Sequence, residues 1–243
     1  MYLADEFCNP FDGNPENFLM KLEHCGRYQY AYDNIKKTDI VADIACATGY
    51  GSYFLAQKAK VVIGGDCKEV YLDYAKHNCH APNISYVSVD LEKGIKVLEK
   101  RNINKIICFE TLEHTRCPLK IISAFYDLLP PKGEVILSFP NKAYELFDEN
   151  GKNQDPYHLS EIDLKEFLIH VTKEGFRVKN IFGQTMINDL VKQSADFQRK
   201  YHLSLDELYH YDIESILYFS RRFAYPNDFE INHSYSFIIH LQK

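Results

Sequence analysis

Short apolar runs alternate with helix-like segments along most of this chain, and this alternation restricts the possible folds more than any other feature. Runs such as 40–44, 60–65 and 134–139 are apolar at consecutive positions, which is typical of strands buried on both faces. Between them, apolar residues recur at helical spacing. The pattern predicts an α/β fold whose parallel sheet is covered by helices on both sides. The predicted strands are 40–44, 60–65, 84–89, 105–109, 134–139, 176–182 and 235–241.

The chain is predicted to form one domain, residues 1–243, with one additional segment. An N-terminal helix of about 14–35 begins at Asn14 and Pro15, a capping residue followed by proline at the first helical position. Residues of about 186–232 separate the last two predicted strands, far more than a hairpin needs. We therefore expect this segment to be an inserted cap over one end of the sheet.

Composition and charge exclude several classes of protein. The net charge is −6, from 28 basic and 34 acidic residues, and no dense basic run is present, so a nucleic-acid partner is not expected. No apolar stretch approaches the roughly 20 residues that span a bilayer, and the acidic N-terminus does not resemble a secretory signal. The seven scattered cysteines lack C-x-x-C spacing. Together these features predict a soluble cytoplasmic protein with neither a disulfide framework nor a metal site.

The segment DIACATGYG, residues 43–51, carries the strongest functional signal. It joins the end of a predicted strand to the start of a helix through small residues, so backbone N–H groups can approach a ligand closely. The next predicted strand ends at Gly65 and Asp66, where a carboxylate can accept both hydroxyls of a ribose. Since ligands bind at the carboxyl ends of strands in open α/β sheets, the two features predict a cofactor that contains a nucleoside.

Several segments together resemble the class I S-adenosylmethionine-dependent methyltransferases. Residues 43–49 are similar to the family motif D-x-G-C-G-T-G, and residues 109–114, FETLEH, to its fourth-strand signature. LPPKG at 129–133 and SFPN at 138–141 continue the resemblance, and residues 23–31 resemble the E-H-x-x-R-Y-x-x-A segment of one bacterial subgroup. The resemblance implies a Rossmann-like, doubly wound, seven-stranded sheet that is mostly parallel with one antiparallel edge strand.

The same resemblance implies which residues bind S-adenosylmethionine. The turn after the first strand would hold the methionine part, Asp66 the ribose and Asp90 the adenine, with Leu91 beside it. A basic side chain from the N-terminal helix, Arg27, would meet the cofactor's carboxylate. The full set of implied cofactor-binding residues is Arg27, Tyr28, Asp43, Ala45, Ala47, Gly49, Tyr50, Asp66, Cys67, Asp90, Leu91 and Glu110.

One departure from the family motif concerns Ala45 and Ala47, which stand where the family commonly has glycine. A methyl group at these positions is expected to demand negative φ and to take up space for the ligand. Gly49 and Gly51 remain to form the turn. The departure leaves open a second function class, a methyltransferase-like module that binds ligands without catalysis.

Two histidines are candidates for the base that removes a proton from a hydroxyl acceptor. His114 follows the fourth predicted strand, and His158 lies in the loop after the fifth. The expected reaction is O-methylation of a small metabolite, such as a sugar or phosphorylated sugar precursor of surface polysaccharide, the acceptor class that the resembling subgroup implies. N-methylation and the oligomeric state stay open. An NAD-dependent oxidoreductase is a further alternative, but it requires G-x-G-x-x-G, and the corresponding residues 45–50 read ACATGY.

Overall fold

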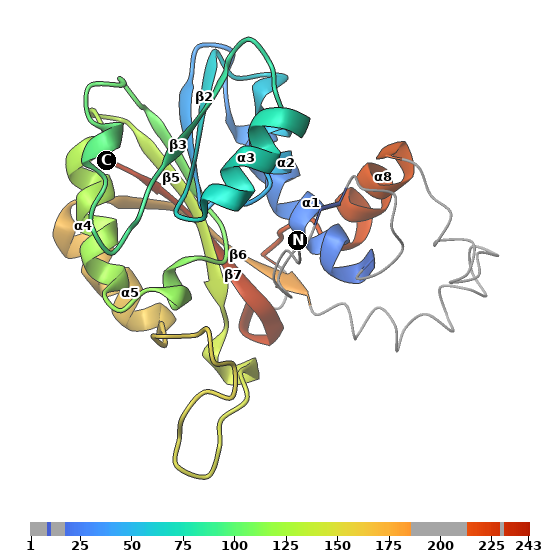
Figure 1. Ribbon diagram of the computed structural model, residues 1–243. Coiled ribbons are helices and arrows are strands. Elements are labelled where there is room, and N and C mark those ends of the chain that lie inside the picture. Colours follow the sequence, from blue (N-terminus) through green and yellow to red (C-terminus); the bar gives the residue numbers. More distant parts are fainter. Residues whose placement is uncertain (1–8, 11–17, 186–212, 229–230) are drawn as a thin grey trace.

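The computed structural model describes residues 9–10, 18–185, 213–228 and 231–243, and within them a seven-stranded sheet forms the centre (Figure 1). The strand order is β3-β2-β1-β4-β5-β7-β6. The α/β class and the Rossmann-like sheet predicted from the sequence are confirmed. The strands are β1 Ile40–Ile44, β2 Val61–Asp66, β3 Ile84–Ser88, β4 Lys105–Cys108, β5 Glu134–Pro140, β6 Arg177–Thr185 and β7 Ser234–Gln242. The helices are α1 Phe18–Asn34, α2 Tyr50–Ala56, α3 Glu69–Asn78, α4 Pro118–Leu128, α5 Leu164–Glu174 and α8 Ile213–Phe223, with short 3₁₀ turns η1 Lys96–Leu98, η2 Leu112–His114, η3 Lys142–Tyr144 and η4 Ile231–His233.

The antiparallel part of the sheet is formed by β7, which pairs with β5 on one side and β6 on the other. The strand at the edge is therefore β6, and the antiparallel strand lies one place inside it. The other neighbouring pairs, β3–β2, β2–β1, β1–β4 and β4–β5, are parallel. Their carboxyl ends meet along one edge of the sheet, which we call the carboxyl edge, and that edge carries the predicted site.

Consecutive strand residues pack on opposite faces of the sheet, as the unbroken apolar runs predict. Ile106 and Cys108 of β4 belong to the core that packs against α4 and α5, whereas Ile107 packs with α1 and α2. Figure 1 shows the corresponding layers, with α4 and α5 on one side of the sheet and α1, α2 and α3 on the other. No helix in the described residues is long and apolar enough to cross a membrane.

Helix α8 is the α-helix described within the predicted insert, and it packs along α1. At Gly26 of α1, a Cβ would lie 2.2 Å from the carbonyl oxygen of Ala224, the residue that follows α8. Arg221 forms two hydrogen bonds with the carboxylate of Asp33, at 2.7 and 3.0 Å. Residues 186–212 lie outside the described residues, as does the predicted start of the N-terminal helix at residues 14–17, so the cap remains a prediction.

The opposite, amino end of the sheet is held by a group of charged side chains around Glu134. Its carboxylate accepts hydrogen bonds from Lys105 and Lys179, both at 2.6 Å, and lies 3.2 Å from His240 Nε2. Burial alone would raise the pKa of Glu134, but the hydrogen bonds from His240, Lys105 and Lys179 hold it well below its usual value. The group joins β4, β5, β6 and β7.

Candidate active site

The turn between β1 and α2 adopts a left-handed backbone at three positions. Ala45 has φ +56°, Ala47 has φ +46° and Gly49 has φ +81°. The expectation that the alanines would demand negative φ is therefore wrong. They keep the conformation that glycine would adopt, because Cys46 N–H donates to the carbonyl of Gly65 and Gly49 N–H donates to that of Cys46. These bonds hold the turn against the strain of two left-handed alanines.

Asp66 ends β2 beside this turn, and its carboxylate ties the two segments together. One oxygen accepts the N–H of Ala47 and the other the N–H of Lys68, each at 2.9 Å. The residue is 7% exposed, and burial raises the pKa of Asp66. Each carboxylate oxygen has a second lone pair, so the group retains acceptor capacity for two further donors such as ribose hydroxyls.

Asp43 lies under the turn at the end of β1 and is fully enclosed. It accepts hydrogen bonds from the hydroxyls of Ser52, at 2.6 Å, and Tyr28, at 3.1 Å. Burial raises the pKa of Asp43 to about 7, against the effect of these two bonds. Its carboxyl group thus connects α1, β1 and α2, and it titrates near neutral pH.

Arg27 extends from α1 into the same region and is also buried. Its guanidinium donates to Gln184 Oε1 at 2.7 Å. Burial would lower the pKa of Arg27, but the carboxylates of Glu110 and Glu23 raise it, so the side chain is a fixed positive charge. Glu110 follows β4, has φ +42° and accepts a hydrogen bond from Ser236 at 3.0 Å, while its Oε1 is buried without a hydrogen-bond partner among the described residues.

Three aromatic rings lie between α1 and the end of β4. Tyr28 packs edge-on against Tyr50, with ring centroids 5.4 Å apart, and against Phe109, at 5.2 Å. The hydroxyl of Tyr50 lies 2.5 Å from His24 Nδ1. Burial and the nearby Arg27 place the pKa of His24 well below its usual value. A neutral imidazole and three aromatic rings form a wall that is compatible with a cationic ligand.

The remaining predicted cofactor residues lie along the same edge but are less enclosed. Asp90 accepts the N–H of Glu92 and forms an ion pair with Lys93 at 2.8 Å, so its carboxylate has protein partners of its own. Leu91 is half-buried, and Cys67 is exposed. The structure thus brings the predicted set together at the ends of β1, β2, β3 and β4, with Arg27 and Tyr28 added from α1.

His114 and His158, the two candidate bases, lie next to each other. Their ring centroids are 5.1 Å apart, although the two histidines are far apart in the sequence. His114 Nδ1 lies 3.1 Å from the carbonyl oxygen of Tyr157, and His158 Nδ1 lies 2.6 Å from Glu145 Oε1. Since both partners are acceptors, each Nδ1 donates a hydrogen bond, and in the neutral ring with this tautomer the lone pair is on Nε2.

The backbone of Glu113 holds this histidine pair together. Its carbonyl oxygen accepts the N–H groups of Leu159, at 2.8 Å, and Ser160, at 3.1 Å. These bonds attach the loop after β5 to η2, and Figure 1 shows that loop, in yellow, projecting beyond the sheet. Glu113 is 3% exposed, and its Oε2 has no hydrogen-bond partner in the described part of the chain. Burial and the neighbouring Glu110 raise the pKa of Glu113 well above its usual value.

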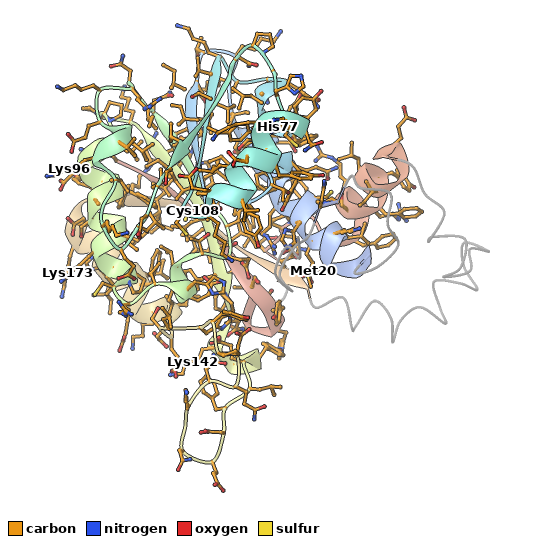
Figure 2. The ribbon with its side chains drawn as sticks, in the orientation of Figure 1. Met20, His77, Lys96, Cys108, Lys142 and Lys173 are labelled. Atoms are coloured by element: carbon orange, nitrogen blue, oxygen red, sulfur yellow. The ribbon has the colours of Figure 1, made fainter. Side chains whose placement is uncertain are left out.

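A cavity of about 850 Å³ lies elsewhere, between the end of β5 and α5. Its described lining includes Asn141, Lys142 and Phe237, but none of the predicted cofactor or catalytic residues. Figure 2 shows Lys142 below the sheet, far from the labelled His77 of α3. We therefore assign the site from the residues at the carboxyl edge rather than from this cavity.

Several residues of the site were not predicted from the sequence. Ser52 and Gln184 orient Asp43 and Arg27, and Glu145 orients His158, yet none of them belongs to a motif. Glu113 stands in the fourth-strand signature, but its spacing alone is equally consistent with a helix cap. Of these residues, only Ser52 could have been found from the sequence, because it lies nine residues after Asp43 and within the first turn of α2.

Comparison with known proteins identifies the family. Residues 35–203, more than half of the chain, match a family described as a methyltransferase domain. A ubiquinone biosynthesis O-methyltransferase of Coxiella burnetii is 31% identical over 109 residues, 44% of this chain and 46% of that protein. The aligned segment thus spans about half the length of this relative.

Solved structures share the fold over nearly the whole chain. An S-adenosylmethionine-dependent methyltransferase from Mesorhizobium loti superposes with a TM-score of 0.61, at 13% identity, covering 91% of this chain and 100% of that one. The [4+2]-cyclase SpnF gives the same TM-score at 10% identity, covering 96% and 86%. Because a cyclase has this fold as well, the fold alone does not decide the reaction.

Proposed function

The chain belongs to the S-adenosylmethionine-dependent methyltransferases, and from this premise we propose that it transfers the methyl group of S-adenosylmethionine to a hydroxyl group of a small molecule. The observation that carries the proposal is the pairing of two sites on one sheet edge. Asp66, Asp43 and Arg27 surround the β1–α2 turn, and the histidine pair lies after β4. One set suits a nucleoside cofactor, and the other suits an acceptor that must lose a proton.

The residues present fit the cofactor. Asp66 is nearly buried beside a turn that presents backbone N–H groups, and it retains acceptor capacity for ribose hydroxyls. Arg27 offers a permanent positive charge for a carboxylate. The buried Glu110 Oε1, which has no partner among the described residues, and the aromatic wall of Tyr28 and Phe109 suit a positively charged group. When bound, S-adenosylmethionine supplies a methyl group on an electrophilic sulfonium.

The protein contributes to the reaction mainly by orientation and proton removal. Methyl transfer is an in-line displacement, so the walls of the site align the acceptor and exclude water. The cofactor would supply the methyl group with sulfur as the leaving group, and the acceptor hydroxyl would lose its proton as its oxygen takes up that methyl group. The Nε2 lone pair of His114 or His158 accepts that proton in this proposal.

The acceptor is proposed to be a sugar or phosphorylated sugar precursor, as the segment 23–31 suggests. The likeness to a ubiquinone biosynthesis O-methyltransferase favours oxygen over nitrogen as the methylated atom, and it makes an aromatic hydroxyl the alternative acceptor. The net charge of −6 argues against a polyanionic substrate. A screen of radiolabelled methyl transfer to sugars, sugar phosphates and catechols distinguishes these classes.

Titration calorimetry with S-adenosylmethionine tests the proposal directly. We expect wild-type protein to bind one equivalent and Asp66→Asn to bind roughly 10- to 100-fold more weakly, because a charged acceptor is lost. Glu99→Asn, an exposed position after η1, serves as the control and should bind like wild type. Absence of binding by the folded wild-type protein would contradict the proposal and favour a module that does not use this cofactor.

A further inference from the structure

We infer that Glu113, His114 and His158 form a binding site for a divalent transition-metal ion beside the proposed cofactor site. One ligand atom from each of the three side chains lies within 4.8 Å of the other two. A carboxylate and two imidazoles are a donor set that holds zinc and related ions in catalytic sites, with a coordination position left open. The sequence analysis predicted no metal site, because that prediction used only the cysteines and the spacing of residues along the chain.

The carboxylate of Glu113 is the first independent support. Its Oε2 is buried without a hydrogen-bond partner among the described residues, and the residue is 3% exposed. A buried carboxylate in such surroundings is costly unless a cation or a proton compensates it. A metal ion bound by the two neighbouring imidazoles provides that compensation.

The second support is the orientation of the two histidines. Metal-binding histidines usually donate their other N–H to a carboxylate or a backbone carbonyl, which fixes the ring and the tautomer. His158 donates to the carboxylate of Glu145 and His114 to the carbonyl of Tyr157, one example of each arrangement. Asn153 also donates to Glu145, at 2.7 Å, so the supporting carboxylate is itself held.

The distances require only a small contraction. Ligand atoms about 2.1 Å from a tetrahedral ion are roughly 3.4 Å apart, so separations of up to 4.8 Å must close by up to about 1.4 Å. Rotation of Glu113, whose Oε2 has no hydrogen bond to break within the described residues, can supply this movement. The backbone bonds from Leu159 and Ser160 to Glu113 already hold both parts of the site together.

A metal at this position would bind the oxygen of the acceptor and lower the pKa of its hydroxyl. The proton then passes to solvent water, and the histidines serve as ligands instead of as bases. This role rests on the proposed function, whereas metal binding itself does not. The role of the metal ion also restricts the proposed acceptors to hydroxyl compounds, since a divalent metal ion binds the oxygen anion that a hydroxyl group forms.

Cobalt(II) is the probe, because its visible absorption reports the number and type of ligands. After treatment with a chelator, the full chain is titrated with CoCl₂ by calorimetry and absorption, and we expect one ion per chain. Removal of a supporting hydrogen bond typically lowers metal affinity roughly 10- to 100-fold, and we expect a loss in this range for Glu145→Gln. The loss of cobalt affinity should be larger for each variant that removes a ligand, namely His114→Asn, His158→Asn and Glu113→Gln. His77→Asn, on the outer side of α3, is the control and should bind cobalt like wild type (Figure 2).

Circular dichroism identifies any variant that fails to fold. If a ligand variant does not fold, Glu145→Gln still tests the site, because it leaves all three ligands in place and should weaken cobalt binding. Failure of wild-type protein to bind cobalt stoichiometrically, or unchanged binding in the three ligand variants, overturns the inference. S-adenosylmethionine is titrated into the same metal-free sample. Cofactor binding without cobalt binding rejects only the metal site, and cobalt binding without cofactor binding rejects only the proposed function.

Discussion

At the scale of single residues, the left-handed alanines of the β1–α2 turn lead to a prediction about stability. A left-handed backbone costs an alanine roughly 1–2 kcal/mol more than a glycine. Glycine in turn lowers the free energy of unfolding by about 0.4–1 kcal/mol, because it increases the entropy of the unfolded chain. Ala45→Gly and Ala47→Gly should therefore each raise the free energy of unfolding by about 0.5–1 kcal/mol. Urea denaturation of the ligand-free protein measures the change.

Ala124→Gly, within α4, is the matched control for these two variants. The same substitution in a regular helix should lower the free energy of unfolding by about 0.5–1 kcal/mol, because no left-handed strain is relieved. If all three variants lose stability alike, the turn does not have the backbone described here.

Asp43 leads to a prediction about pH. Its pKa in the folded protein is raised by burial to about 7, against 3.8 in the unfolded chain, so folding takes up a proton between these values. The stabilising effect of the protonated form is complete below pH 3.8 and is lost as pH rises through 7. In this interval the free energy of unfolding should fall by up to about 1.4 kcal/mol per pH unit from this group.

Asp43→Asn removes this titration while leaving a side chain that can bond to Ser52 and Tyr28. The free energy of unfolding of the variant, relative to that of wild type, should increase from about pH 5 to about pH 7.5 and stay constant above that. Asp73→Asn, on the exposed face of α3, is the control. A difference that does not change with pH would show that Asp43 is already ionised at the acid end of this range.

At the scale of secondary structure, the contact between α1 and α8 predicts a strong effect of one added methyl group. In Gly26→Ala the new Cβ would meet the carbonyl oxygen of Ala224 at 2.2 Å, and backbone on both sides must move. Overpacking of this kind costs about 1–3 kcal/mol. Thermal and urea unfolding should show this loss, together with weaker cofactor binding, since Arg27 is the next residue of α1.

The control for this contact is Lys76→Ala, on the exposed face of α3, which should change the free energy of unfolding by less than about 0.5 kcal/mol. A Gly26→Ala variant as stable as this control would mean that α8 does not pack on α1 as described.

The elements themselves could largely be predicted from the sequence, because each depends on local spacing. The seven predicted strands all occur, with ends shifted by at most three residues, and the helices between them occur as well. Pairing could not be predicted in the same way. The place of β7 between β5 and β6, and that of α8 on α1, depend on side chains far apart in the sequence, such as Arg221 and Asp33.

The site shows the same division. The residues at or just beyond strand ends, Asp43, Asp66 and Glu110, could be identified because a strand end fixes where the side chain lies. Both His114 and His158 could be named as candidates, but their mutual contact could not be predicted. It requires the loop after β5 to fold back on η2 through hydrogen bonds to the backbone of Glu113, and backbone acceptors have no sequence signature.

At the scale of the whole molecule, the charged group at the amino end of the sheet predicts a large stability effect. Lys105 is 4% exposed at its side chain, and Glu134 is the nearer of its two carboxylate partners, at 2.6 Å against 3.7 Å for Asp39. Removing one partner of a buried ion pair costs about 3–5 kcal/mol, so Glu134→Gln should lose an amount of this order. Denaturant titration at neutral pH provides the measurement.

Glu99→Gln, an exposed substitution of the same kind, should be neutral in this assay. Because the pKa of Glu134 is lowered in the folded state, its contribution is present above pH 4.5 and is lost as pH falls further. Wild type and Glu134→Gln should therefore become more similar in stability in acid. A gap that stays constant from about pH 7 down to about pH 3 would contradict this assignment.

The position of β7 also affects how the molecule is made. On the ribosome, β5 and β6 emerge before the strand that must lie between them, so β5 exposes an unpaired edge throughout the synthesis of the insert. Nascent chains arrested before Ser234 should bind chaperones and be cut readily by protease, whereas chains arrested with Gln242 outside the exit tunnel should resist both. Translation of the insert thus sets how long the growing polypeptide is open to aggregation.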